Sequence, residues 1–277
     1  MEVFGETALL IWSTPVIVAL IIAEVLWTHF HKVKAYTLKE TLTNCYLAAL
    51  NGSFDILMRG VVLVVMTFFY KHKLFDLGHG WSYWLLLFLA EDFAFYTLHC
   101  VDHFCRFFWA VHVTHHSSPE FNLSTGFRSS VFQPLYRVAY FAPLAWVGFQ
   151  PMDVLFMYAA TQIYGSLIHT ERIKKMGWLE YILVTPSHHR VHHASNPRYL
   201  DKNMGMCLII WDKIFGTFQP EDESDPPRYG ITKTLNDRGP INIVFHEWKD
   251  LFSDVKTVAK NWRERLGFII HGPGWKP

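Results

Sequence analysis

Long apolar runs separated by short polar stretches make up the chain as far as Ile168. Three runs approach the roughly 20 residues that a helix needs to cross a membrane. Two more are joined by Gly148-Phe149-Gln150-Pro151, which is short enough only for a tight helical hairpin. The five runs are residues 8–27, 46–70, 81–98, 131–149 and 152–168. The pattern predicts an all-α integral membrane protein, a helical bundle with up to five spans.

The distribution of lysine predicts how these spans are oriented. Lys32, Lys34 and Lys39 follow the first run, and positively charged loops tend to stay in the cytoplasm. Alternate crossings then bring residues 99–130, and everything after Ile168, to the same side. We therefore expect a multi-pass membrane protein whose polar region faces the cytoplasm.

The second run contains two charged residues, Asp55 and Arg59, four positions apart on one helical face. Charges inside a membrane segment are costly unless they are paired or functional. We interpret them as a local pair that offsets its own cost of burial.

A further helical pattern follows the polar region. From 241 to 266 the apolar residues recur at helical spacing, with lysines and arginines mostly between them. This pattern predicts an amphipathic helix that lies on the bilayer or, as we favour, packs on the polar region. The chain thus divides into membrane spans at 1–98, a central region at 99–240 that includes the hairpin at 131–168, and a C-terminal helix and tail at 241–277.

Composition narrows the class of protein. Of 277 residues, 51% are apolar and 18% are charged, and the net charge is +1. The charged share is below the roughly 25% of soluble domains, and no basic surface for nucleic acid is indicated. Four cysteines without CxxC spacing support neither a disulfide framework nor a thiolate zinc site. Sixteen histidines are the anomaly.

Ten of these histidines lie between positions 99 and 193 and form motifs. Two HxxHH motifs in one chain are far rarer by chance than one. Residues three or four apart share a helical face, so each motif can direct several imidazoles to one point. The ten are His99 and His103 (HxxxH), His112, His115 and His116 (HxxHH), the single His169, and His188, His189, His192 and His193 (HHxxHH). The other six histidines we interpret as structural or solvated.

The spacing between the first two motifs predicts a break in the helix. His103 and His112 are nine residues apart, which is about half a turn out of phase on a straight helix. A bend between Phe104 and Trp109 would let both motifs face one site.

The number of histidines implies two metal ions. A single zinc site uses three or four protein ligands, and the eight to ten histidines available exceed both counts. Imidazole also suits iron, copper and nickel. The Glu-x-x-His pairs of soluble di-iron proteins are absent. Next to apolar spans, such a centre suggests oxidation of a lipid by O₂. The predicted catalytic ligands are His99, His103, His112, His115, His116, His189, His192 and His193, and His169 and His188 are additional metal-ligand candidates.

Other polar residues near the motifs have possible supporting roles. We expect Glu91 and Asp92 to orient ligands or to be structural, and His188 to be a ligand or to hold one in place. Two roles are possible for Glu120, Asn122 and Arg128: they position a polar headgroup or they cap helices. We favour helix capping. Trp211 and Asp212 are expected to brace the region.

Two other classes of function stay open. One is a non-redox, zinc-dependent membrane hydrolase, although no histidine motif contains the general-base carboxylate of HExxH. The other is a metal-handling membrane protein without catalysis. Its ionisable residues would be spread through the mid-membrane region, whereas these histidines gather at one end of the spans.

The three motifs, together with the short sequence segments around them, resemble those of the fatty acid hydroxylase/sterol desaturase superfamily of integral membrane di-iron enzymes. The resemblance is greatest to the branch of alkylglycerol monooxygenase and its bacterial relatives, and it runs from about Glu91 to Thr234. It rests on the sequence segments 109–112, 115–118, 122–125, 185–193, 201–203 and 211–218.

The resemblance implies a membrane base of four-helix type beneath a cytoplasmic helical cap that carries the histidines. It also implies two iron ions, O₂, a lipid substrate and an external electron donor. That donor would be tetrahydrobiopterin, or a b-type cytochrome or ferredoxin with its reductase. The expected activity is hydroxylation of a lipid C–H bond, of the alkylglycerol monooxygenase or the sterol desaturase kind.

Overall fold

The computed structural model describes residues 5–233, 235 and 237–277, so Thr234, where the resemblance ends, lies outside the described residues. Within the described ranges the chain is helical and forms no strand, only two isolated bridges. The order is α1 Glu6–Phe30, α2 Leu38–Lys71, α3 Trp81–Phe104, α4 Arg106–His116, η1 Leu123–Phe127, η2 Gln133–Leu135, α5 Val138–Val147, α6 Pro151–Leu167, η3 Gly177–Tyr181, α7 Pro186–His192, α8 Ile210–Phe215, α9 Pro240–Thr257 and α10 Trp262–Ile270.

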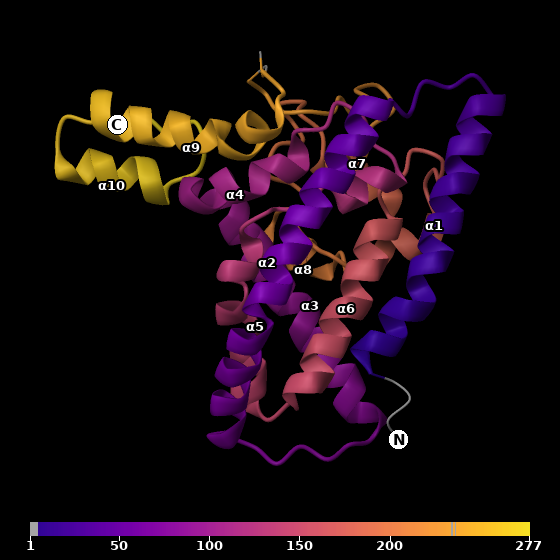
Figure 1. Ribbon diagram of the computed structural model, residues 1–277, viewed down its shortest axis with the longest axis vertical. Coiled ribbons are helices and arrows are strands. Elements are labelled where there is room, and N and C mark those ends of the chain that lie inside the picture. The colour runs from indigo at the N-terminus through magenta and orange to yellow at the C-terminus, as the bar shows by residue number, and fades with distance from the viewer. Residues whose placement is uncertain (1–4, 234, 236) are drawn as a thin grey trace.

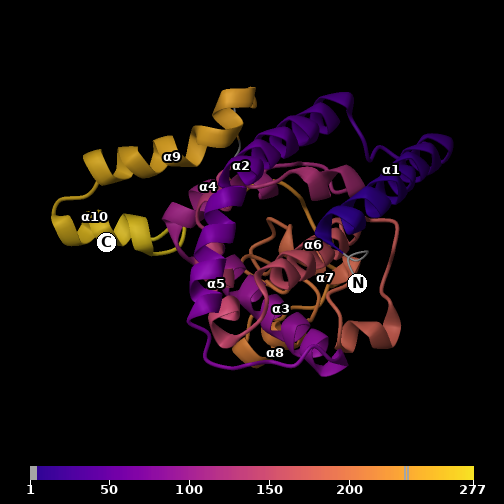
Figure 2. The same cartoon turned by 60° about the horizontal axis from the view of Figure 1, so that its bottom comes forward.

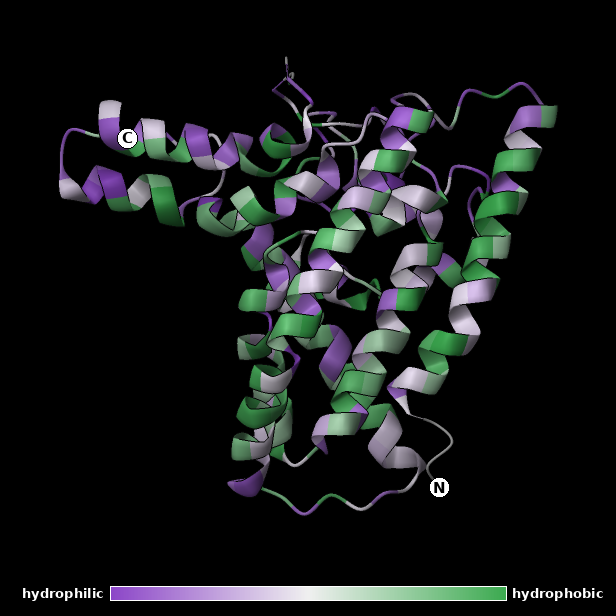
Figure 3. Ribbon diagram, viewed as in Figure 1, coloured by the Kyte–Doolittle hydropathy of each residue, from purple (hydrophilic) through white to green (hydrophobic). Residues whose placement is uncertain are grey.

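Three helices form the membrane base. α1, α2 and α3 are long and apolar enough to cross a bilayer, as the first three runs predict. They stand side by side with α5 and α6 (Figure 1), and apolar residues predominate along their length (Figure 3). α4 and α7 lie across one end of this bundle (Figure 1), so the polar central region forms a cap on one side. The chain is therefore an all-helical membrane protein.

The fourth predicted span is wrong. The apolar run 131–149 forms turns and the short η2, which has Pro134 in its first turn, before α5 begins at Val138. α5 has ten residues, which is about 15 Å of helix and half of a bilayer core. The hairpin between α5 and α6 is confirmed, and it turns at Gly148 with φ +133°. A Cβ there would lie 2.3 Å from the Phe75 carbonyl oxygen, so the turn requires glycine.

The two charges of the second run pair with other helices and not with each other. Arg59 bonds both carboxylate oxygens of Glu6 in α1. Asp55 accepts a hydrogen bond from Arg137, which precedes α5. Pairs between helices satisfy both charges within the apolar region and tie α2 to its neighbours on two sides. The apolar core lies beside these pairs, between α2, α3, α5 and α6.

The predicted break after the first histidine motif is confirmed. α3 ends at Phe104, Cys105 takes an extended conformation with φ −122° and ψ 116°, and α4 begins at Arg106. α4 consequently turns across the end of α3 (Figure 1), which brings the histidines of both helices to one place.

The C-terminal pattern folds into two helices and not one. α9 ends at Thr257, and Asn261 caps α10 by accepting a hydrogen bond from the Glu264 backbone N–H. The two helices form a hairpin that projects sideways from the bundle (Figures 1 and 2). Arg106 of α4 donates to Glu247 and Asp254 of α9, both at 2.7 Å. The expected packing of this segment on the cap is thus confirmed.

Candidate metal centre

Nine of the ten predicted histidines meet in two adjacent groups. In each group one ring nitrogen from every member lies within 4.8 Å of the others. We call these the five-histidine group and the four-histidine group. The first comprises His99, His103, His112, His116 and His192, and the second comprises His115, His169, His189 and His193. They adjoin where the rings of His116 and His193 stack with centroids 4.4 Å apart.

Each group draws on several elements. The end of α3 supplies two members, α4 supplies three, and His169 follows the last turn of α6. α7 is short, and with its C-cap His193 it sends His192 to one group and His189 and His193 to the other. The HxxxH pair converges on one group, as the sequence predicts. Each HxxHH motif instead divides between the two groups, so α4 and α7 each serve both.

Backbone carbonyls fix the orientation of four of these rings. The Nδ1 atoms of His99, His115, His169 and His192 lie 2.7–3.0 Å from the carbonyl oxygens of Met204, Arg128, Gly165 and Lys202, respectively. A carbonyl only accepts, so each Nδ1 carries the proton. A neutral ring then presents an Nε2 lone pair to the interior of its group.

The inward nitrogens are too close to be explained by hydrogen bonds alone. In the four-histidine group the Nε2 atoms of His169, His189 and His193 lie 2.9–3.2 Å from one another. Because His169 carries its proton on Nδ1, three mutual contacts cannot all be hydrogen bonds. In the five-histidine group, the Nε2 atoms of His103 and His192 are buried without any partner. A cation that accepts several lone pairs satisfies both sets, so the residues fit one metal ion in each group.

Burial favours the neutral form of the seven grouped histidines that lie in the cap. It lowers the pKa of His115 to about 4, and it lowers the pKa of the other cap histidines of the groups well below their ordinary 6.5, with help from neighbouring histidines. Neutral imidazole is the form that binds metals.

Carboxylates support the ligands from behind. Asp201 lies 3.1 Å from His103 Nδ1. Asp102 lies 3.7 Å from His112 Nδ1, too far for a hydrogen bond, and accepts instead from Gln133 and Tyr136. Asp212 accepts hydrogen bonds from the backbone N–H groups of Met204 and Gly205, and the Met204 carbonyl holds His99. The expectation that Asp212 braces the cap is confirmed.

His188 is the one predicted ligand that the structure does not bring to the groups. Its Nδ1 accepts a hydrogen bond from the Thr185 N–H, 3.3 Å away, and so caps the start of α7. Adjacent residues of a helix point about 100° apart, which directs His188 away while His189 faces the group.

The other polar candidates are structural. Neither Glu91 nor Asp92 bonds a histidine; Asp92 instead accepts from Cys207, Leu208 and Trp211 and ties their segment to α3. Asn122 caps η1. Arg128 is fully buried and donates to Glu40, Asn44 and the Thr114 carbonyl, among others. Glu120 accepts from the Thr37 N–H ahead of α2. The helix-capping interpretation therefore holds for Asn122.

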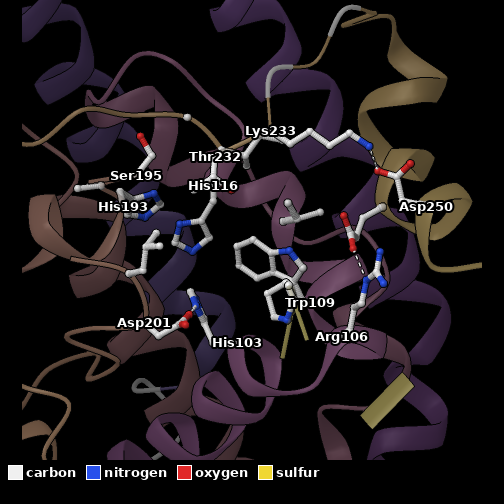
Figure 4. Close-up of a pocket in the computed structure, with 18 of the residues that line it drawn as sticks. His103, Arg106, Trp109, His116, His193, Ser195, Asp201, Thr232, Lys233 and Asp250 are labelled. Atoms are coloured by element: carbon white, nitrogen blue, oxygen red, sulfur yellow. Dashed lines mark hydrogen bonds and ion pairs between the residues drawn. The ribbon is translucent and has the colours of Figure 1, made fainter. Parts of the chain in front are cut away.

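Cavities approach the groups from two sides. The larger one, about 430 Å³, opens between the cap and the α9–α10 hairpin (Figure 4). Its inner wall is Trp109 with His103, His116, His192 and His193, and its rim carries the ion pair of Lys233 and Asp250. The smaller one, about 100 Å³, lies among the spans and is lined by the remaining five ligand candidates: His99, His112, His115, His169 and His189.

Sequence reasoning missed Asp201 and Ser130 as partners of ligand candidates. Asp201, at φ +56°, belongs to the segment 201–203, which is one of those that carry the family resemblance, so the resemblance was the available signal. The Ser130 hydroxyl reaches His112 Nδ1 at 3.0 Å from an irregular segment that no periodicity describes.

Known proteins resemble this chain over most of its length. Residues 84–217 match the fatty acid hydroxylase family model. Alkylglycerol monooxygenase of Homo sapiens is 37% identical over 272 residues, which cover 96% of this chain and 59% of that protein. An ornithine lipid hydroxylase of Rhizobium tropici is 30% identical over 146 residues, covering 52% of this chain and 44% of that protein. A Delta(7)-sterol 5(6)-desaturase of Gibberella zeae is 27% identical over 175 residues, covering 58% and 50%.

The chain therefore spans somewhat over half the length of the alkylglycerol monooxygenase that it matches. No solved structure matches it.

Proposed function

Since the chain carries a domain of the fatty acid hydroxylase family over residues 84–217, we propose that it is a membrane-bound di-iron monooxygenase that hydroxylates a lipid C–H bond with O₂. The observation that carries the proposal is the pair of adjacent all-histidine groups at one end of an apolar bundle. The relatives are named as a monooxygenase, a hydroxylase and a desaturase of lipids, which supports oxidation as the reaction.

We assign the nine grouped histidines as ligands of two iron ions, one in each group. When bound, the irons supply the redox chemistry that activates O₂ and cleaves the C–H bond. The chain's own contribution is to hold six of the nine rings by a carbonyl, hydroxyl or carboxylate and to exclude water from the inward nitrogens. Overall, a lipid C–H bond and O₂, with two electrons and two protons from the donor, yield a lipid C–OH bond and water.

The smaller cavity is the proposed place for the reacting carbon. It reaches ligand candidates of both groups from within the spans, where a lipid resides. Its wall combines apolar Phe95 and Met206 with the polar side chains of Arg137, Tyr158 and Gln162. The Nε2 of Gln162 is buried without a partner and is available to a polar group of the substrate.

The larger cavity is the proposed route for the electron donor. It reaches ligand candidates of both groups from the side opposite the spans, and about 430 Å³ lies in the range of small-molecule sites. A donor such as tetrahydrobiopterin would enter it, whereas a b-type cytochrome or ferredoxin would dock at its rim. Separate approaches for lipid and reductant keep the two reactants on opposite sides of the ligand groups.

We also propose that the cap and the larger cavity face the cytoplasm. Lys32 and Lys34 lie in the loop between α1 and α2, and Lys39 lies in the first turn of α2, all at the cap end of these helices, so the positive-inside tendency gives the cap this orientation.

The zinc hydrolase and the metal-handling protein are less well supported. Within the described residues neither ligand group includes a carboxylate member. A hydrolytic zinc site commonly has a general-base carboxylate beside its ligands, and the nearby Asp201 is instead bonded to a ligand candidate.

The test is metal analysis and O₂ uptake by the purified chain with lipid and reductant. We expect two irons per chain and O₂ consumption coupled to a lipid product heavier by one oxygen. His192→Ala should abolish the oxidation, and His29→Ala, at an exposed histidine outside both groups, should not. Zinc alone after expression in iron-replete cells, with no O₂ uptake, would overturn the proposal.

A further inference from the structure

The α9–α10 hairpin has more surface exposed than its packing explains. It projects sideways from the spans, at the level of α4 (Figures 1 and 2). Leu251, Ala259 and Phe268 are buried in a small cluster between the two helices. Arg106 anchors α9 to the cap through Glu247 and Asp254. The outer faces of both helices are left open.

Each helix of the hairpin exposes an apolar stripe. On α9, Ile241, Phe245 and Phe252 follow helical spacing and are 69%, 40% and 63% exposed. On α10, the exposed apolar residues Trp262, Leu266 and Ile270 recur every four positions. Contiguous exposed apolar surface of this kind marks a binding surface.

The α9 stripe continues onto the surface of the spans. Phe245 packs on Phe132, with ring centroids 5.8 Å apart, and Phe132 packs on Phe54 of α2 at 5.3 Å. Phe107 of α4, itself 42% exposed, contacts Trp248 of α9. Since α2 crosses the membrane, the stripe is continuous with a surface that faces lipid.

Charge is segregated on the hairpin. The α9 acids Glu247, Asp250 and Asp254 line the larger cavity and pair with Arg106 and Lys233. Four cations around the tip are exposed, and among the described residues no carboxylate lies within ion-pair distance of them. These are Lys256, Lys260, Arg263 and Arg265.

We propose that the α9–α10 hairpin lies in the membrane interface and binds anionic phospholipid headgroups through these four cations, with its apolar stripes in the acyl boundary. The amphipathic pattern, the unpaired cations and the continuity with α2 are what such a helix pair requires. Because three acids of α9 line the larger cavity, lipid binding would also hold the outer wall of that cavity in place.

The experiment uses the full chain in nanodiscs of phosphatidylcholine, with or without phosphatidylglycerol. A nitroxide is attached at Leu266→Cys in the stripe or at Thr257→Cys on the opposite face of α9, after the exposed Cys45 is changed to alanine. We expect the label at 266 to be relaxed by lipid-soluble oxygen and the label at 257 by a water-soluble nickel complex. Phosphatidylglycerol should deepen the label at 266.

A charge variant separates headgroup binding from simple insertion. Replacing the four cations by glutamine should remove the effect of phosphatidylglycerol, since each cation near an anionic surface favours binding roughly fivefold. Lys174→Gln with Lys175→Gln, exposed cations elsewhere, should leave the effect intact. A water-accessible label at 266 in both lipids would overturn the proposal. So would a short distance between labels at 266 of two chains, which would make the stripe a contact between copies.

Discussion

The carboxylate of Asp212 offers a direct test of how the cap orients a ligand. Asp212 is fully buried and accepts from Met204 N at 2.7 Å, Gly205 N at 2.8 Å and Thr217 Oγ1 at 2.6 Å. Met204 in turn holds His99 Nδ1 through its carbonyl oxygen at 2.8 Å. The orientation of one ligand candidate therefore depends on a side chain that touches no histidine.

Asp212→Asn keeps the volume but replaces one acceptor oxygen by an NH₂ group. Whichever way the amide lies, this group faces a donor, and a buried donor left unsatisfied costs about 1–3 kcal/mol. We expect a loss of stability of about 2–4 kcal/mol once the weaker bonds to a neutral acceptor are added. Loss of the support behind His99 should lower metal affinity roughly 10–100-fold.

The assay is thermal unfolding in detergent together with iron per chain after dialysis against a graded chelator. Asp76→Asn, at a carboxylate that is 90% exposed beside Lys73, is the control and should leave both quantities unchanged. If the Asp212→Asn variant has the same unfolding temperature and the same iron per chain as the parent, the turn at Met204 does not depend on this carboxylate. The reasoning then fails.

Three further predictions follow from individual contacts. His169→Ala reduces the four-histidine group to three ligands, and because α7 serves both groups we expect metal analysis to show well below two irons per chain; two would contradict the assignment. Burial raises the pKa of Glu221, but hydrogen bonds and the charge of Arg190 outweigh it and lower the pKa below its ordinary 4.5. The Glu221–Arg190 ion pair thus stabilises the fold above pH 4.5, and this contribution is lost as the pH falls through the lower pKa of the folded state. Glu221→Gln should therefore make the free energy of unfolding fall less steeply in acid. Gly165→Ala would place a Cβ 2.2 Å from Met206 Sδ beside the smaller cavity, costing about 1–3 kcal/mol in an unfolding assay. In a Met206→Ala background the added cost of Gly165→Ala should disappear, and a cost that persists would count against this contact.

The parts of the site that the sequence predicts are those governed by helical phase. The spacing from His103 to His112 requires a break, and the structure has it at Cys105, because phase is a local property. Phase also predicts that residues four apart, such as His112 and His116 or His189 and His193, enter the same group, but not that the third histidine of each HxxHH motif enters the other group. It does not distinguish His188 from His189, since that depends on where α7 begins and which face meets the cap.

The errors come from properties that only the folded chain possesses. Apolar content suggests a span at 131–149, but Pro134 and the turns before Val138 leave a short helix. The partners of Asp55 and Arg59 lie on other helices, so spacing within α2 does not identify them. Apolar residues keep their helical spacing through the turn between α9 and α10, so the sequence pattern does not reveal that one helix ends and another begins.

α7 and its C-cap carry ligand candidates to both groups over a span of only five residues, His189 to His193. An ion bound by either group therefore fixes the same helical turn that the other group needs. Filling the first group removes part of the ordering cost of filling the second, so loading should be cooperative and chains with a single ion should be scarce. The two positions then behave as one unit, which is gained or lost together.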